Sequence, residues 1–163
     1  MTTQRLTDLE KNLELRYETL GKAEKRLAIT DEIFSKNAIE LRIREEILPE
    51  IRKYKAEYWE VMMQEVRYRL VEETEASHAI GEVIQEVQVI QSQGNCPPEL
   101  MQLLLEIRDK LNQPGIAAAA KAKLALPLIP GIVSYEVELD TENLLRRVFQ
   151  PLKQLFKSTL AKN

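Results

Sequence analysis

Apolar residues recur every seven positions along the first 48 residues of the chain. This ladder comprises Leu6, Leu13, Leu20, Leu27, Phe34, Leu41 and Leu48. A seven-residue spacing keeps one stripe of a helix facing a partner helix. The companion positions are poorer, because Arg16, Asn37 and Arg44 stand where a two-stranded zipper needs apolar side chains. The pattern predicts helices packed in a bundle or hairpin, with the partner helix in this chain or in another copy.

The ladder meets a candidate turn at residues 28–32. Thr30 and Asp31 are residue types that cap helix N-termini by accepting from free backbone N–H groups. Neither Gly nor Pro stands beside them, so a continuous helix and a short turn are both open. The capping residues favour the turn, which would give two antiparallel helices of roughly 20 residues each.

Pro49 interrupts the helical pattern that follows. Proline removes one backbone donor and clashes with the preceding turn, so Pro49 either kinks a long helix or sits at the start of a new one. Apolar residues then recur at helical spacing from Ile51 to Ile90. Gly81 weakens this stretch by about 1 kcal/mol relative to Ala. We still expect a long third helix that reaches about Gln91.

A clear stop lies between Gly94 and Pro98. Glycine is common just after a helix and proline at the first position of one. A new helix is therefore expected to begin at Pro98 and to end before Gly115. We place the main boundary here, between a helical bundle or coiled coil at residues 1–93 and a smaller unit at residues 94–163.

The C-terminal unit changes character after Gly115. The stretch from Leu124 to Gly131 is apolar and holds two prolines, so it cannot form a regular helix. Apolar residues then alternate with polar ones at Val133, Tyr135, Val137 and Leu139. This period of two predicts a half-buried strand. A strand needs a pairing partner, within the chain or in another copy, to satisfy its backbone groups.

A terminal amphipathic helix follows the predicted strand, capped by Asp140 or Thr141, with Phe149 and Phe156 on its apolar face. Residues 141–163 carry five basic side chains and one acidic side chain, so this tail is cationic. The sequence as a whole predicts a mainly α fold. It begins with a helical hairpin or coiled-coil bundle and a long third helix. A smaller unit follows, with one helix, a possible single strand and the terminal amphipathic helix.

Composition narrows the classes of partner. The chain has 163 residues, of which 30% are charged, as is typical of long helices with solvated faces. Its net charge of −3 argues against nucleic acid, because phosphate binding needs a clustered positive field. A single cysteine, Cys96, and a polar N-terminal segment favour a cytoplasmic protein.

Patterns of catalytic or metal-binding residues are weak. His78 is the only histidine, and Glu75 and Glu82 share its helical face. One histidine with two carboxylates on one helix is a non-specific arrangement that lacks any zinc signature. Cys96 has no base nearby in the sequence, and the five scattered glycines do not form a phosphate-binding loop. We therefore predict no enzyme activity, no cofactor and no bound metal.

An aromatic cluster at Tyr54, Tyr58 and Trp59 is mixed with basic residues. Stacking platforms for nucleic acid have a similar composition. A packed aromatic edge of the core explains the same residues and is the preferred interpretation. Tryptophan is also enriched among the residues that anchor protein interfaces, which makes Trp59 a candidate contact residue.

Two segments carry a resemblance to known proteins. These are ELRIREEILPEIRKYKAEYWEVM at residues 40–62 and AKAKLALPLIPGIVSYEVELDTENLLRRVFQPLKQLF at residues 120–156. They resemble small helical effector-associated modules of cyanobacterial conflict-signalling proteins, which accompany NTPase switch domains and CHAT or caspase-like peptidases. The resemblance implies an adaptor role by homotypic association. No NTPase or peptidase motif is present in this chain, so such activity would belong to partners.

We therefore expect a non-catalytic adaptor or oligomerisation module that binds protein, either itself or a signalling partner. The expected contact residues are the seven ladder residues together with Tyr54, Tyr58, Trp59, Val133, Tyr135, Val137, Leu139, Phe149 and Phe156. The alternative is a membrane-docking effector that uses the apolar segment from Leu124 to Gly131 and the cationic C-terminal helix. We favour the adaptor, as a homo-oligomer, over the membrane-docking effector.

Overall fold

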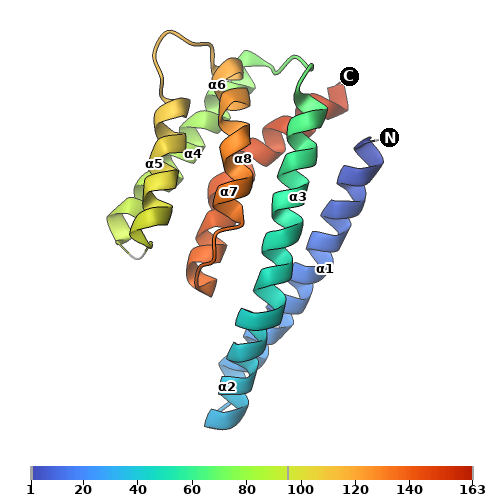
Figure 1. The fold of residues 1–163 in the computed structure, drawn as a ribbon, viewed down its shortest axis with the longest axis vertical. Helices are drawn as coiled ribbons and strands as arrows, with labels where there is room; N and C mark the ends of the chain where they lie inside the picture. Colours follow the sequence, from blue (N-terminus) through green and yellow to red (C-terminus); the bar gives the residue numbers. More distant parts are fainter. Residues whose placement is uncertain (1, 95, 163) are drawn as a thin grey trace.

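The computed structural model describes residues 2–94 and 96–162, and helices account for most of them (Figure 1). In chain order they are α1 (Thr2–Ile29), α2 (Ile33–Arg42), the π-helical turn η1 (Ile43–Ile47), α3 (Leu48–Val66), α4 (Glu73–Gln93), α5 (Pro98–Leu111), α6 (Ala118–Ala125), the 3-10 turn η2 (Leu126–Leu128), α7 (Ile129–Val133) and α8 (Leu139–Lys162). No strand occurs within the described ranges. The predicted mainly α fold is confirmed.

The predicted turn at residues 28–32 is also confirmed. Helix α1 ends at Ile29, where the Thr30 hydroxyl donates to the Arg26 carbonyl at 2.5 Å. The chain then reverses, and α1 packs along α3. The capping residue is Glu32, whereas Thr30 or Asp31 was predicted. Its carboxylate accepts from the backbone N–H of Phe34 and Ser35 at 2.9 and 2.7 Å.

Pro49 neither ends nor begins the second half of this hairpin, which runs without a break from Ile33 to Val66. The π-helical turn η1 directly precedes the proline. Within it, the Leu48 N–H donates to the Ile43 carbonyl, five residues back. A wider turn is a common way for a helix to absorb a local fault in its hydrogen bonding. The missing donor of Pro49 is therefore accommodated inside one continuous helix.

The expected single helix to Gln91 is wrong, because α3 ends at Val66 and α4 begins at Glu73. Glu72 explains the break. Its backbone is extended, and its carboxylate accepts from the Glu75 N–H at 2.6 Å, which caps α4. Glutamate is an uncommon capping residue, and no Gly or Pro marks the loop, so the break was difficult to predict from local residue types.

The boundary between Gly94 and Pro98 is confirmed as a break between helices. Gly94 has a φ of +69°, a left-handed conformation that glycine adopts without strain, and its N–H closes the last turn of α4. Pro98 opens α5. Residues on both sides of the boundary nevertheless share one buried core, since α3 packs against α7 and α4 packs against α6 and α8.

The predicted strand at Val133, Tyr135, Val137 and Leu139 is wrong. Val133 ends helix α7 and Leu139 begins α8, with an irregular connection between them. Val133 and Val137 are buried while Ser134 and Glu136 are exposed, so the alternation reflects a connection that follows the core surface. No neighbouring strand among the described residues offers the hydrogen bonds that a strand requires.

The apolar segment from Leu124 to Gly131 is not a regular helix, as predicted, but it is helical in pieces. Helix α6 ends at Ala125, the 3-10 turn η2 follows, and α7 begins at Ile129. Pro127 and Pro130 each stand in the first turn of a new piece, where a missing N–H leaves no helical bond unmade. Leu126 and Ile129 are buried in the core.

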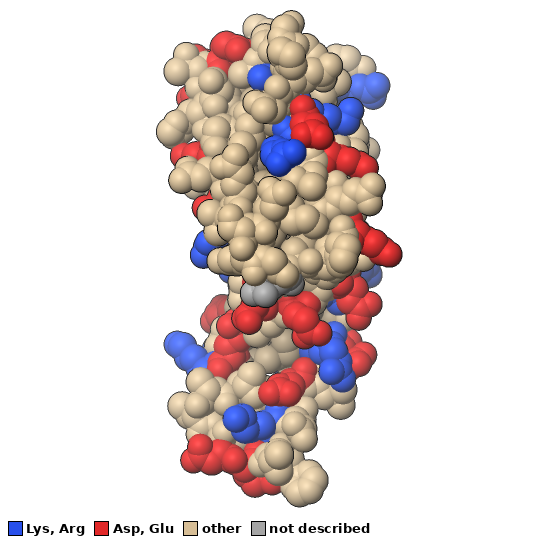
Figure 2. Space-filling model, turned by 90° about the vertical axis from the view of Figure 1, so that its left-hand side faces the viewer, with Lys and Arg blue, Asp and Glu red and all other residues tan. Residues whose placement is uncertain are grey.

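The molecule is an elongated body with a projecting arm (Figure 1). Helices α4 to α8 pack beside one end of the α1–α3 hairpin. The other end, which contains α2 and η1, extends beyond them. Figure 2 shows this arm below the body, with acidic and basic side chains gathered on it. Helix α2 contains no buried residue, which marks the end of the arm as the most exposed helical part of the chain.

A long-range cap fastens helix α6 to α4. The Glu73 carboxylate accepts from the N–H groups of Ala118 and Ala119 at 2.7 and 3.0 Å. These hydrogen bonds hold the pKa of Glu73 below its usual value near 4.5. The stabilisation is therefore present above that value and is lost as the pH falls through the lower pKa of the folded state.

Replacing Glu73 by alanine should therefore lower the thermal midpoint at pH 7, since it frees two donors at the start of α6. The difference from the parent chain should narrow as the pH falls below 4.5. Circular dichroism melts at several pH values measure both effects. The matched control is Glu60→Ala, an exposed glutamate of α3. Equal effects of the two substitutions would contradict the capping role.

Candidate interaction site

The heptad ladder divides into a buried part and an exposed part. Leu6, Leu13, Leu20 and Leu48 are buried between α1 and the helices that cover it, and Leu27 is half-buried. Their partner helix lies within this chain, because α1 packs chiefly on α3. Phe34 and Leu41 are different, since both face solvent on the arm.

Four exposed apolar side chains lie on or beside the arm, three of them next to its turn and the fourth about two helical turns along α2, and we call this group the apolar tip. Its residues, with their exposed fractions, are Ile29 at 80%, Ile33 at 65%, Phe34 at 79% and Leu41 at 50%. Ile29 and Ile33 flank the turn at which the hairpin reverses. Single exposed apolar residues are ordinary, but a group of this kind on one projecting element is typical of an interaction site.

Most of the other predicted contact residues lie inside the molecule. Trp59 contacts Tyr58 and Phe149 edge to face, with ring centroids 5.9 and 6.3 Å apart. The buried members of the set are Tyr58, Trp59, Val133, Val137, Phe149 and Phe156, and the half-buried ones are Tyr54, Tyr135 and Leu139. The aromatic cluster is thus an edge of the core, which was the preferred interpretation.

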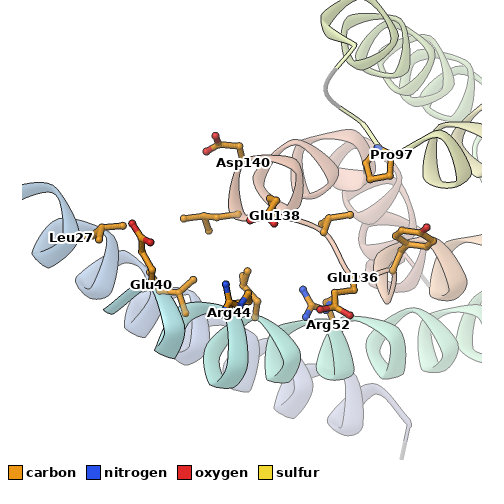
Figure 3. Close-up of a pocket in the computed structure, with 13 residues that line it drawn as sticks. Leu27, Glu40, Arg44, Arg52, Pro97, Glu136, Glu138 and Asp140 are labelled. Carbon is orange, nitrogen blue, oxygen red and sulfur yellow. The ribbon is translucent and has the colours of Figure 1, made fainter. Parts of the chain in front are cut away.

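A cleft lies at the base of the arm, between α2–α3 and the connection that precedes α8 (Figure 3). Its volume is about 780 Å³. It is lined by Leu27, Glu40, Ile43, Arg44, Leu48, Arg52, Pro97, Tyr135, Glu136, Val137, Glu138, Leu139 and Asp140. The lining therefore combines apolar walls with two arginines and four carboxylates.

Arg52 is the unusual member of this lining. The residue is only 8% exposed, and its Nη1 atom has no hydrogen-bond partner among the described residues. Figure 3 shows the side chains of Arg44 and Arg52 rising from the helix into the cleft. Leaving a buried charged donor unsatisfied is unfavourable. The Nη1 atom of Arg52 is thus a buried donor without an acceptor among the described residues at the wall of the cleft.

Arg52 was not predicted as a site residue, although the spacing of the residues on its helical face could have indicated a buried charge. Leu48, Arg52, Lys55 and Trp59 follow one another at four, three and four residues, which places them on one helical face. All four are buried. Two basic residues within an otherwise apolar stripe indicate buried charges. From the sequence, Arg52 and Lys55 were expected only as basic residues at the rim of the aromatic edge of the core.

Lys55 finds a partner where Arg52 does not. Its Nζ lies 3.4 Å from Glu142 Oε1, and the two side chains are 7% and 2% exposed. Burial lowers the pKa of Lys55, and the charge of the Glu142 carboxylate opposes that shift. The pair joins α3 to the first turn of α8.

His78 and Cys96 have ordinary surroundings. His78 Nε2 lies 2.9 Å from Glu82 Oε1 on the exposed face of α4, while Glu75 pairs with Lys162 at 2.9 Å. Within the described ranges, no group of three or more His, Cys, Asp or Glu side chains is placed to hold a metal ion. Cys96 is half-buried, and burial raises the pKa of its thiol. The absence of enzyme activity stays a prediction.

Comparisons with known proteins add no relative. No protein-family model matches the chain, and neither a curated protein nor a solved structure matches it. The resemblance to effector-associated modules therefore stays a prediction. None of the described helices is long and apolar enough to cross a membrane.

Proposed function

We propose that the chain is a non-catalytic protein interaction module that associates with further copies of itself through the apolar tip. One observation carries this proposal. The ladder residues are buried along the body, but Phe34 and Leu41 are exposed on the arm, where helix α2 contains no buried residue. Helix α2 contributes little to the core of its own chain, so another use accounts for its exposed apolar side chains better.

The energies involved favour association. Burying an apolar side chain of this size contributes about 1.5–3 kcal/mol. Because the four tip residues are 50–80% exposed, burying them in each of two copies would contribute roughly 8–16 kcal/mol in total. Association itself costs roughly 4–15 kcal/mol in lost freedom of motion. The apolar tip is therefore large enough to support a reversible complex.

The biological context is a further part of the proposal. The resemblance of residues 40–62 and 120–156 to effector-associated modules supports an adaptor role in bacterial signalling or defence, in the cytoplasm. In that setting the module brings partner proteins together and leaves any catalysis to them. A projecting arm with an apolar end suits such a role, because it can reach another protein without unfolding the body.

A membrane-docking role is supported less well. The segment that would insert has its apolar residues Leu126 and Ile129 in the core. The apolar face of α8 is also buried, at Leu145, Val148, Phe149, Leu152, Leu155 and Phe156. Membrane docking through these residues would require the body to open, whereas self-association through the apolar tip requires no rearrangement.

Replacing Ile33, Phe34 and Leu41 together by glutamine should abolish self-association. Glutamine is a good helix former, so the arm should keep its helices while it loses its apolar surface. Sedimentation velocity over a range of protein concentrations measures the oligomer. The free energy of unfolding of the monomer should change little, because these side chains are exposed.

Leu15→Gln is the matched control, because Leu15 is a 55% exposed leucine of α1 that lies outside the apolar tip. It should leave association intact. A parent chain that stays monomeric at every concentration would contradict the proposal. Equal losses of association in the control and in the triple variant would contradict it as well.

A further inference from the structure

A smaller groove lies on the body between α1, α3 and α8, and none of its lining residues belongs to the arm. Its volume is about 260 Å³. Three basic side chains line it, Lys55 of α3 and Arg146 and Lys153 of α8, together with the phenols of Tyr17 and Tyr58. The groove therefore brings together basic and hydroxyl groups from three helices.

Helix geometry directs the two bases of α8 towards this groove. Arg146, Phe149 and Lys153 follow one another at three and four residues, which places them on one face of the helix. Phe149 fixes that face against α3, because it packs on Trp59 with ring centroids 6.3 Å apart. Two basic residues of the cationic C-terminal tail thus line a groove of the body.

Arg146 and Lys153 contact aromatic rings. The Arg146 Cζ atom lies 3.6 Å from the centroid of the Tyr17 ring, and the Lys153 Nζ atom lies 5.2 Å from that of Tyr58. Neither base forms an ion pair with a described residue. The rings hold both side chains at the groove by cation–π contact, and their charges remain available to an anion.

The nearby carboxylates leave these two charges largely uncompensated. Glu142 lies 3.4 Å from the Lys55 ammonium, and Glu10 lies 2.6 Å from that of Lys157, so each of these acids has its own base. The remaining carboxylate of the lining, Glu14, is exposed to solvent. The groove therefore has two bases without an acidic partner against a single exposed carboxylate.

The bases also repel one another. Burial is the main cause that lowers the pKa of both Lys55 and Lys153, and the positive charge of Arg146 lowers each further. The carboxylates of Glu142 and Glu10 oppose these shifts. A bound anion would reduce the repulsion, because an opposite charge nearby favours the protonated form of each lysine.

The phenols add neutral donors to the groove. Neither the Tyr17 nor the Tyr58 hydroxyl forms a hydrogen bond with a described residue, and neither oxygen is among the fully buried atoms that lack a partner. Burial raises the pKa of both phenols above the usual value of 10.0. Both therefore keep their proton at neutral pH and can donate it to an acceptor oxygen.

We propose that this groove binds a phosphate group, either as inorganic phosphate or as part of a small phosphomonoester. The proposal goes beyond self-association and does not depend on the apolar tip. It rests on the two ring-bound bases without acidic partners, the two phenolic donors and the enclosed space between three helices.

Phosphate matches the groove in charge, geometry and size. It carries a charge of about −1.5 to −2 at neutral pH, which offsets the charges of Arg146 and Lys153. The planar guanidinium of Arg146 can bind two of its oxygens, and the remaining oxygens can accept from Lys153 and the phenols. Sites for drug-sized molecules have volumes of about 300–1,000 Å³. A groove of about 260 Å³ therefore suits phosphate with a small organic group.

Calorimetric titration at low ionic strength tests the ligand. Inorganic phosphate and glycerol 3-phosphate should each bind saturably, with one site per chain. Tighter binding of one of them identifies the free anion or the phosphomonoester as the better ligand. Absence of saturable binding of both at millimolar concentrations would overturn the proposal. Tighter binding of succinate, a dicarboxylate, would overturn phosphate as the ligand class.

Replacing either unpaired base tests the site. Arg146→Gln and Lys153→Gln should each weaken phosphate binding by about 10- to 100-fold, as expected for loss of a hydrogen bond between charged groups. Arg147→Gln is the matched control, because Arg147 is the adjacent arginine of α8 but pairs with Glu86 outside the groove. It should leave the dissociation constant unchanged. Equal weakening in the control and the test variants would indicate non-specific attraction and overturn the site.

Tyr58→Phe removes one hydroxyl and keeps the ring that Lys153 contacts. This conservative variant should fold like the parent chain, as circular dichroism measures, and should bind phosphate about 2- to 10-fold more weakly. Unchanged affinity in Tyr58→Phe and in the corresponding Tyr17→Phe would overturn the role of the phenols.

Nuclear magnetic resonance locates the bound anion. Trp59 is the only tryptophan of the chain and lines the groove, so its indole N–H gives a single signal from this site. That signal should shift during a phosphate titration, with the midpoint that calorimetry gives. A signal that stays fixed at saturating phosphate would place the anion elsewhere and overturn the proposal. Phosphate binding by a chain that never self-associates would contradict the proposed function and leave this site standing.

Discussion

Replacing Glu142 by glutamine is expected to lower the free energy of unfolding by about 3–5 kcal/mol at neutral pH. The carboxylate is the ion-pair partner of the Lys55 ammonium, at 3.4 Å, and both side chains are more than nine-tenths buried. Glutamine has nearly the same shape but no charge. The substitution would thus leave an ammonium group in the core without compensation, which is more unfavourable than the loss of the attraction alone.

Urea denaturation followed by circular dichroism measures this effect. The double variant Lys55→Met/Glu142→Gln removes both charges and should recover much of the lost stability, because its buried ammonium is gone. A loss below about 1 kcal/mol in the single variant would indicate a solvated pair of the surface type. That result would contradict the burial of both groups.

The pH dependence of the variant has a definite sign. Burial lowers the pKa of Lys55 in the folded chain, and the Glu142 carboxylate opposes this shift. Without Glu142 the pKa should fall further, so the folded chain releases its proton at a lower pH than the unfolded chain does. Between the two pKa values the unfolded state binds more protons, and stability rises with pH. The deficit of Glu142→Gln should therefore shrink as the pH rises from 7 towards 10.

Two buried phenols limit that pH range. Burial raises the pKa of both Tyr17 and Tyr58 above the usual value of 10.0. The unfolded chain loses these protons first, so the folded state loses stability as the pH rises above 10. The comparison of Glu142→Gln with the parent chain is therefore informative below that pH.

Replacing Trp59 by alanine is expected to lower the free energy of unfolding by about 3–5 kcal/mol. The indole is buried, contacts Tyr58 on its own helix, and packs edge to face on Phe149 of α8. Its removal leaves a cavity at the junction of α3 and α8 that the surrounding helices cannot fill completely. The two helices lose their principal aromatic contact at the same time.

Phe34→Ala is the natural comparison for this variant, because both residues were predicted as contact residues from the sequence. Phe34 is 79% exposed, so the free energy of unfolding of the monomer should change by less than about 0.5 kcal/mol. Association should instead weaken. The same urea titration at low protein concentration measures both variants, and equal destabilisation of the two would contradict the division between core and apolar tip.

The fold was predictable where local chemistry has few alternatives. The seven-residue spacing of the ladder indicated paired helices, and Gly94 with Pro98 marked a break that those residue types produce almost anywhere. The location of the partner helix in the same chain was not predictable, because the residues of a helix face do not indicate which helix packs on it.

Other features depended on tertiary contacts. The alternation from Val133 to Leu139 was typical of a strand, but a strand requires a neighbour, and the segment instead crosses the core surface between two helices. The break after Val66 was not predictable, because the residue that caps the next helix is a glutamate, which is uncommon at that position. The cleft was not predictable either, because Arg52 becomes part of it only when residues 135–140 pack nearby in the folded chain.

The π-helical turn before Pro49 changes the register of the arm. One extra residue within a turn rotates all the preceding residues by roughly 100° around the helix axis relative to the residues that follow. Residues 34, 41 and 48 would nearly align in a regular helix, yet here Leu48 faces the core while Phe34 and Leu41 face solvent. A chain shortened by one residue between positions 43 and 47 would rotate both side chains by roughly 100° relative to Leu48. The ladder residues therefore lie on two surfaces. Those of α1 and α3 contribute to the core of the monomer, whereas those of α2 are exposed and available to a partner. The extra residue of the π-helical turn separates the two groups.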